Sequence, residues 1–157
     1  MTAGVTVVCG APGSGKTRWV AENFQRGDLV VDIDTLYMAL SGLPMYDKPQ
    51  QLLPFVCEAR DAIYRRMCRT NAVRHAWIIT SDPKTETRKQ LRTFFAASVL
   101  VMDVTAAVCL ERISMDPRRA GQMDLWTPLV MRWYRTFECQ PFDTLIAQVD
   151  KPEEVPQ

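Results

Sequence analysis

The chain has 157 residues, of which 47% are hydrophobic, and its formal net charge is +1. This length and composition fit one domain with a sizeable core, and the balanced charge does not by itself indicate a nucleic-acid-binding protein. No apolar stretch approaches the ~20 residues of a membrane-spanning helix, and no secretory signal precedes the first expected strand. Five scattered cysteines without a CxxC pair predict reduced thiols. We therefore expect a cytoplasmic protein without a membrane partner.

Short apolar runs alternate with helical patterns along the chain. The continuously apolar runs predict buried parallel strands at residues 6–9, 29–31, 77–80, 99–102 and 144–149. Helical patterns lie at residues 15–25, 35–41, 50–69, 85–96, 105–114 and 127–138. Thr105 and Thr127 are expected to be helix N-caps, the second followed by Pro128 at the first helical position. The alternation predicts an α/β fold with a five-stranded parallel sheet and helices on both faces.

No linker in the sequence is long enough to separate two domains. We expect one domain over residues 1–151 and a loose tail over residues 152–157. The stretch 115–126 is polar, contains Gly121 and lacks periodicity. It is interpreted as a short lid that carries Arg118 and Arg119.

Residues 10–17 match the complete phosphate-binding pattern GxxxxGK[ST] between the first strand and the first helix. In such a loop, backbone N–H groups surround phosphate oxygens. Lys16 reaches the β- and γ-phosphates, and Thr17 offers its hydroxyl to Mg²⁺. The motif therefore predicts a P-loop NTPase fold that binds ATP and Mg²⁺. The expected nucleotide-binding residues are Gly10, Ala11, Pro12, Gly13, Ser14, Gly15, Lys16 and Thr17.

The candidate acidic residues follow the second, third and fourth predicted strands, at the edge of the sheet where ligands of α/β folds bind. Phosphoryl transfer needs a carboxylate that deprotonates the attacking hydroxyl and an acidic residue that holds Mg²⁺. Asp34 lies farther beyond its strand than Asp32, so we expect Asp34 to be the base. Asp32 either orients the acceptor or caps the next helix. Asp82 is the expected metal residue, with Asp103 in reserve.

Basic side chains are concentrated in two further parts of the chain. An arginine of the lid, Arg118 or Arg119, could close on the nucleotide and stabilise the transferring phosphoryl group. Residues 60–92 contain nine basic side chains against three acidic ones. From this stretch we expect Arg65, Arg69 and Arg88 to bind the acceptor, although a solvated helix face would give the same excess.

These residues together resemble the small P-loop kinases of the polynucleotide 5′-hydroxyl kinase type, particularly phage enzymes. The resemblance rests on residues 10–19, Asp34, 78–82, the helix of Arg88, 101–104 and 111–113. It implies that Asp34 is the general base, that Asp82 supports the metal and acceptor site, and that a lid arginine contacts phosphate. A phage-encoded enzyme would act in the cytoplasm of the host cell.

The chain departs from that family in three places. Tyr37 lies in the region where the family usually carries an arginine, the lid is about two residues longer, and we expect no counterpart of the phosphatase domain of some members. The identity of the acceptor therefore stays open.

Three functions are consistent with the sequence. The first is a kinase that transfers the γ-phosphate of ATP to a hydroxyl of a nucleic acid or nucleotide, either a 5′-hydroxyl end or a hydroxymethyl-pyrimidine in DNA. The second is a small-metabolite kinase, because Asp32-Ile33-Asp34 looks like the DxD of shikimate and gluconate kinases. The third is an ATPase or GTPase switch, although Asp82 is followed by Pro83 rather than by the glutamate of hydrolytic machines. No obligate protein partner is evident in the sequence.

Overall fold

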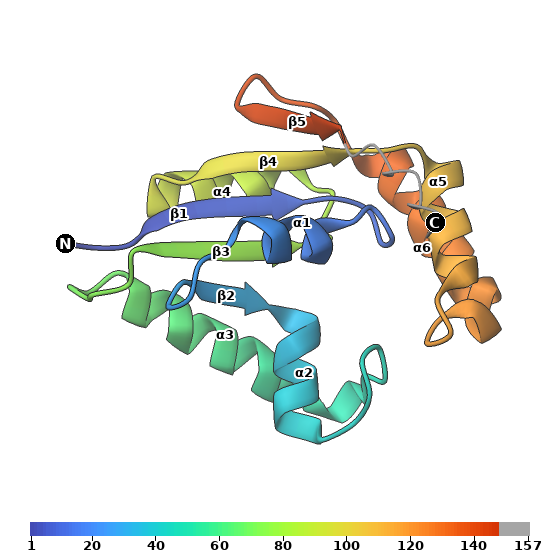
Figure 1. The fold of residues 1–157 in the computed structure, drawn as a ribbon, viewed down its shortest axis with the longest axis horizontal. Coiled ribbons are helices and arrows are strands. Elements are labelled where there is room, and N and C mark those ends of the chain that lie inside the picture. Colours follow the sequence, from blue (N-terminus) through green and yellow to red (C-terminus); the bar gives the residue numbers. More distant parts are fainter. Residues whose placement is uncertain (148–157) are drawn as a thin grey trace, which may run out of the picture.

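The structure of the chain, a computed structural model, describes residues 1–147 (Figure 1). Five strands form one parallel sheet in the order β2-β3-β1-β4-β5. The strands are β1 (Gly4–Cys9), β2 (Leu29–Asp32), β3 (His75–Thr80), β4 (Ser98–Asp103) and β5 (Asp143–Ala147). Strand β1 is central, and its Val7 lies opposite Ile78 of β3 and Val99 of β4. The predicted five-stranded parallel sheet is confirmed, whereas residues 148–149 of the last expected strand and the expected tail lie outside the described residues.

Six α-helices connect or follow these strands in the described part of the chain. They are α1 (Lys16–Asn23), α2 (Ile33–Ser41), α3 (Leu53–Met67), α4 (Thr85–Phe95), α5 (Ala106–Met115) and α6 (Met123–Thr136). The predicted cap of α5 is confirmed, because the Thr105 hydroxyl accepts a hydrogen bond from the Val108 N–H at 3.3 Å. None of the helices within residues 1–147 combines the length and apolar character needed to cross a membrane.

Helix α6 begins four residues earlier than its sequence pattern predicted. The expected N-cap at Thr127 is wrong, and Pro128 lies inside the helix rather than at its first position. The helix extends backwards because Trp126, Val130 and Trp133 form one buried stripe at helical spacing. Burial of the Trp126 ring in the core therefore outweighs the hydrogen bond that the proline removes. As a result, the lid is shorter than expected.

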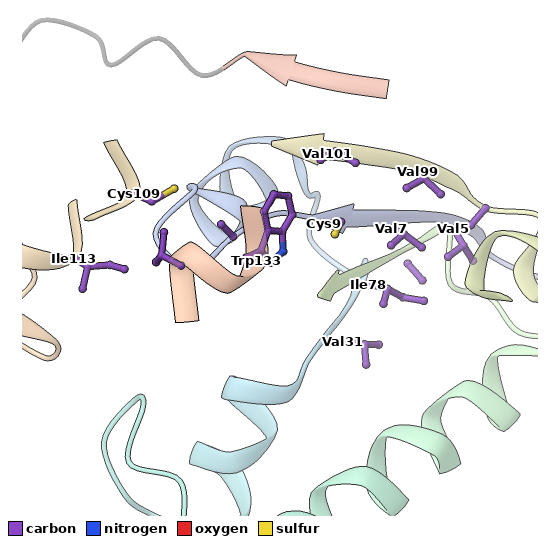
Figure 2. Close-up of a cluster of buried hydrophobic side chains, with 14 of the residues drawn as sticks. Val5, Val7, Cys9, Val31, Ile78, Val99, Val101, Cys109, Ile113 and Trp133 are labelled. Carbon is purple, nitrogen blue, oxygen red and sulfur yellow. The ribbon is translucent and has the colours of Figure 1, made fainter. Parts of the chain in front are cut away.

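The two faces of the sheet are covered by different helices. Val7, Ile78 and Val99 point to the face that packs against α3 and α4, and Figure 2 shows these side chains in the main core. Val8 and Ile79 point to the opposite face and pack around Val20 of α1. Successive residues of a strand alternate between faces, so each strand contributes to both cores. Helices α5 and α6 lie beyond the carboxyl ends of the strands (Figure 1).

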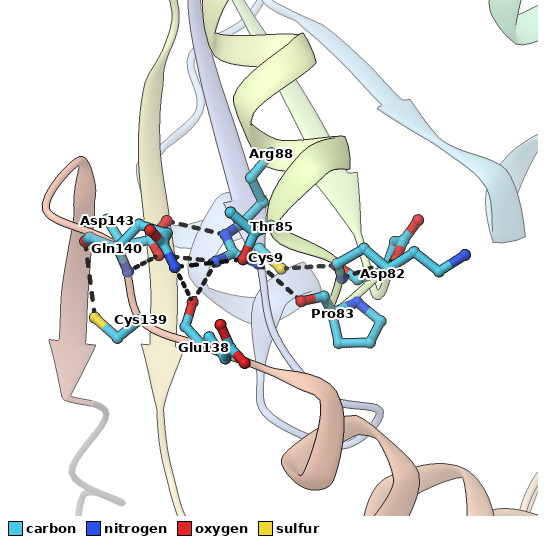
Figure 3. A network of polar contacts seen from close by, with 10 residues as sticks. Cys9, Asp82, Pro83, Thr85, Arg88, Glu138, Cys139, Gln140 and Asp143 are labelled. Carbon is cyan, nitrogen blue, oxygen red and sulfur yellow. Dashed lines mark hydrogen bonds and ion pairs between the residues drawn. The ribbon is translucent and has the colours of Figure 1, made fainter.

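Arg88 of α4 is fully buried and holds three segments together (Figure 3). Its guanidinium pairs with Asp143 of β5 through two hydrogen bonds, at 2.9 and 3.0 Å. It also donates to the carbonyl oxygens of Pro83 and Glu138, and it lies 4.6 Å from the centroid of the Phe137 ring. The expectation that Arg88 binds the acceptor is wrong, because its guanidinium is hydrogen-bonded to other groups of the protein and has no exposed surface.

Candidate nucleotide and acceptor site

The phosphate-binding loop connects the end of β1 to the start of α1 at the carboxyl edge of the sheet. The loop bends sharply at two glycines with left-handed backbones, Gly13 at φ 78° and Gly15 at φ 92°. A Cβ on Gly13 would lie 2.7 Å from the carbonyl oxygen of Cys109 in α5. Glycine is therefore required at this position both by the backbone conformation and by the close approach of α5.

Lys16 lies at the centre of this loop, and its side chain is buried. Its Nζ donates to the carbonyl oxygens of Gly10 and Ala11, at 2.9 and 2.8 Å. Burial lowers the pKa of Lys16 to about 8, since the charged form loses solvation. Phosphate oxygens arriving in the loop would replace the two carbonyl partners and favour the charged amine. The donor set therefore fits the phosphates of a nucleotide.

A cavity of about 770 Å³ opens over the loop and brings most of the predicted site together. Lys16, Thr17, Asp34, Arg118 and Arg119 all line it. Within residues 1–147 there is no group of three or more His, Cys, Asp or Glu side chains that could hold a metal alone. A Mg²⁺ ion here would therefore rely on the Thr17 hydroxyl, water and phosphate oxygens, which is typical of nucleotide sites.

The two aspartates that follow β2 have different roles. Asp32 is buried and caps α2, since its Oδ1 accepts a hydrogen bond from the Asp34 N–H at 3.1 Å. Burial raises the pKa of Asp32, and the neighbouring charge of Asp34 adds to the effect. Asp34 lies in the first turn of α2 with 31% of its side chain exposed, and its Oδ1 accepts from Lys48 Nζ at 2.9 Å. Of the two carboxylates, Asp34 is the one that an acceptor can reach.

Asp82 does not line the cavity over the phosphate-binding loop. Its Oδ1 accepts from the Lys84 N–H at 3.0 Å and its Oδ2 from the Thr87 hydroxyl at 2.8 Å, so it stabilises the start of α4. It lines a second cavity of about 870 Å³ between α3 and α4, while its neighbours Thr80 and Ser81 line the cavity over the loop. The structure therefore does not place Asp82 as the metal residue that the sequence predicted. Asp103, the reserve candidate, lines neither of these cavities.

The lid arginines are held in place by two neighbours. Arg118 and Arg119 both pair with Asp116, at 3.0 and 2.9 Å, and the hydrogen bonds from Arg118 are the main reason that the pKa of Asp116 falls to about 2. Both guanidinium groups also lie over the ring of Tyr46, at 5.2 and 4.5 Å from its centroid. The predicted lid thus carries its cations into the cavity over the loop.

Arg65 and Arg69 lie at the opposite end of the sheet from this cavity. Helix α3 ends where β3 begins (Figure 1), and the following loop is anchored by the Asn71 N–H, which donates to the Met1 carbonyl at 3.1 Å. The expectation that these two arginines bind the acceptor is therefore wrong. A helix that connects parallel strands runs antiparallel to them, so its C-terminal end faces the amino edge of the sheet.

Tyr46 and Lys48 belong to the site, although no sequence pattern indicated them. Both line the cavity over the loop, and both come from the irregular segment between α2 and α3. A single lysine in a loop carries no motif. Only its distance from Asp34 in the folded chain shows that it is part of the site.

The fold and the loop define a P-loop NTPase domain of the kinase-like type. The sequence model of the AAA_33 family of AAA domains matches residues 5–138, and the chain belongs to this family. No curated protein sequence matches the chain.

Several solved structures share the fold at low sequence identity. A gluconokinase from Sinorhizobium meliloti 1021 is 21% identical, with a TM-score of 0.58 over 96% of this chain and 85% of that one. A sugar kinase from Janibacter sp. HTCC2649 is 22% identical, with a TM-score of 0.54 over 93% and 84%. A chain of the Pnkp1/Rnl/Hen1 RNA repair complex is 14% identical, with a TM-score of 0.59 over 87% of this chain and 47% of that one. At these identities the likeness establishes the fold alone.

Proposed function

We propose that this chain is a phosphotransferase that moves the γ-phosphate of ATP to an alcohol group. The observation that carries the proposal is that Asp34, Lys16 and the lid arginines line one cavity at the carboxyl edge of the sheet. A carboxylate, a phosphate-binding amine and guanidinium groups are the components that phosphoryl transfer requires in one place.

Each of these residues has a distinct role in the proposed reaction. The loop and Lys16 hold the β- and γ-phosphates, and Thr17 would hold Mg²⁺, which supplies charge neutralisation when bound. Asp34 accepts the proton of the acceptor hydroxyl. At the same time the oxygen of that hydroxyl bonds to the γ-phosphorus, and the bond between the γ-phosphorus and ADP breaks. Arg118 and Arg119 stabilise the negative charge on the transferring group.

Of the carboxylates in the cavity over the loop, Asp34 is the one placed to meet an acceptor hydroxyl. The carboxylates lining the cavity over the loop are Asp32 and Asp34. Asp32 is buried and caps a helix, so it is not placed to activate a water molecule. Asp34 is partly exposed, and a base that accepts a proton from an incoming hydroxyl must be exposed in this way.

For the acceptor, we propose a hydroxyl of a nucleic acid or nucleotide, either a 5′-hydroxyl end or a hydroxymethyl-pyrimidine in DNA. The second cavity adjoins the first, since Ile33, Ile79 and Thr80 line both. It is lined by two basic and two acidic side chains, and Arg60, one of the basic ones, is paired with Asp61 at 3.0 Å. The other basic side chain, Lys89, lines this cavity together with Phe94, which is 64% exposed. A basic group together with an exposed aromatic ring suits the backbone and a base of a single strand.

A small-metabolite kinase is the second candidate. The DxD residues support it, since Asp32 fixes the turn that presents Asp34. The chain also spans 85% of the gluconokinase but 47% of the RNA repair chain.

One experiment tests the proposal directly. The protein is incubated with γ-labelled ATP and a panel of acceptors: 5′-hydroxyl oligonucleotides, duplexes with hydroxymethyl-pyrimidines, nucleosides, sugars and gluconate. We expect label on one acceptor class, abolished by Lys16→Ala and unaffected by Lys84→Ala, a matched change at an exposed lysine that lines neither cavity. Slow ATP hydrolysis that no acceptor accelerates would instead support the switch.

A further inference from the structure

Residues 44–48, here called the strap, contribute Tyr46 and Lys48 to the lining of the cavity over the loop. The strap contains a turn in which the Asp47 N–H donates to the Pro44 carbonyl at 3.1 Å. At one end of the strap, the Tyr46 ring contacts Arg118 and Arg119 of the lid. At the other end, Lys48 Nζ lies 2.9 Å from Asp34 Oδ1. The strap therefore connects the two groups of residues that flank the reacting hydroxyl.

Tyr46 has a backbone conformation that a non-glycine residue rarely adopts, with φ at 72°. This left-handed conformation costs free energy, so surrounding contacts must hold it. The Tyr46 ring supplies them, because it also packs edge-to-face against Trp126 of α6 at a centroid distance of 5.3 Å. The position of Lys48, two residues later, is therefore set by packing against the lid.

Most of the basic side chains that line the cavity lie outside the phosphate-binding loop. Seven basic side chains line it against two acidic ones. Arg118 and Arg119 both pair with Asp116. Lys48 differs from them, because the carboxylate it contacts is the proposed base itself.

The contact between Lys48 and Asp34 is easily exchanged. About a third of each side chain is exposed, at 36% and 31%, and ion pairs of this kind are weak in water. An acceptor that gave Lys48 another anion would leave the Asp34 oxygen open to an incoming hydroxyl.

We propose that Lys48 is a specificity-determining residue that selects acceptors with an anionic group, carboxylate or phosphate, next to the reacting hydroxyl. This inference rests on the proposed function and names the chemistry of its acceptor. A hydroxyl that donates to Asp34 must lie about 3 Å from a carboxylate oxygen. Lys48 Nζ lies at a similar distance from that carboxylate, so an anion a few bonds from the hydroxyl falls within its reach.

The test uses two pairs of acceptors that differ mainly in charge: gluconate against sorbitol, which is also an open chain, and thymidine 3′-monophosphate against thymidine. Equilibrium binding is measured by calorimetry with ADP present, and KM and kcat are measured with ATP. For one pair we expect the wild type to bind the anionic member about tenfold or more tightly, the usual strength of a hydrogen-bonded charge. Lys48→Met should reduce this preference to threefold or less and act on KM more than on kcat.

Two further variants separate the role of charge from a general effect on the fold. Lys48→Arg keeps the positive charge and should restore most of the preference. Lys84→Met makes the same change at an exposed lysine outside both cavities and should leave the preference intact. Circular dichroism of all variants checks that they fold.

The outcome also distinguishes the two sources of the anion and the two proposals. A preference within the sugar pair indicates a sugar acid, and one within the nucleoside pair indicates a nucleotide phosphate. Equal binding of charged and neutral members by the wild type, or a preference that Lys48→Met leaves unchanged, would overturn the role of Lys48. A preference that depends on Lys48 without any phosphate transfer would support the anion site and contradict the proposed function.

Discussion

The phosphate-binding half and the acceptor half of this site are built in opposite ways. The first consists of eight consecutive residues that run from the end of β1 into the first turn of α1, with a conformation set by two glycines and by the approach of α5. The second is assembled from the start of α2, the strap and the lid, which are distant in sequence. A local motif is specified by its own residues, whereas an assembled surface depends on packing among separate elements. We therefore expect changes in the two halves to have different consequences.

The largest effect should come from the base at the junction of the two halves. Asp34→Asn keeps the shape of the side chain but cannot accept a proton, so turnover should fall by roughly 10²–10⁴. The affinity for ATP, measured by calorimetry, should change little, because the phosphate-binding loop is intact. Asp32→Asn is the control: since Asp32 caps α2, this variant should lose less activity. An active Asp34→Asn and an inactive Asp32→Asn would reverse the assignment of the two carboxylates.

A second prediction concerns the buried ion pair between α4 and β5 rather than the site itself. Arg88→Met leaves Asp143 buried without its partner, and both side chains are 0% exposed. We expect the free energy of unfolding, measured by chemical denaturation, to fall by about 3–5 kcal/mol. The double variant Arg88→Met with Asp143→Leu should recover much of this loss, because no buried charge remains unpaired. If the Arg88→Met variant were stable but had a raised KM for the acceptor, the result would support the assignment of Arg88 to the acceptor site.

A smaller effect should show that Asp82 stabilises the fold and does not hold the metal ion. Asp82→Ala removes two hydrogen bonds at the start of α4 and should lower the free energy of unfolding by about 1–2 kcal/mol. The Mg²⁺ concentration for half-maximal activity should stay the same. Thr17→Val, in contrast, should raise it, because Thr17 lines the cavity of the loop. A strong shift in the Mg²⁺ requirement of Asp82→Ala would show that its carboxylate reorients towards the nucleotide.

The smallest effect is expected for the two arginines at the far edge of the sheet. The double variant Arg65→Ala and Arg69→Ala should leave KM for the acceptor and its salt dependence unchanged. Arg60→Ala with Lys89→Ala removes the same charge from the second cavity. For a nucleic-acid acceptor, this second variant should raise KM and flatten its dependence on salt, which would reflect lost phosphate contacts. Equal behaviour of the two variants would remove the support that the second cavity gives to a nucleic-acid acceptor.

Where sequence reasoning succeeded, the signal was local, and where it failed, a partner distant in sequence was decisive. Continuous apolar runs located all five strands, and Thr105 was recognised as a cap from its immediate neighbours. Arg88 looked like a surface cation on an amphipathic helix, because Asp143 lies 55 residues away. The far position of Arg65 and Arg69 was deducible in principle, since a crossover helix must end at the amino edge of a parallel sheet.

The sequence by itself determined the sheet, the phosphate-binding loop and the presence of a carboxylate after β2. Each of these depends on interactions within a few residues: hydrophobic runs, glycine conformations and the cap of one helix. Tertiary structure decided which cations reach the site, because the sequence around a charged side chain does not identify a partner that is distant in the chain. It brought Lys48 to Asp34 and Tyr46 to the lid, and it buried Arg88 against Asp143. The energy of such contacts depends on distance and burial, which exist only once the elements have packed.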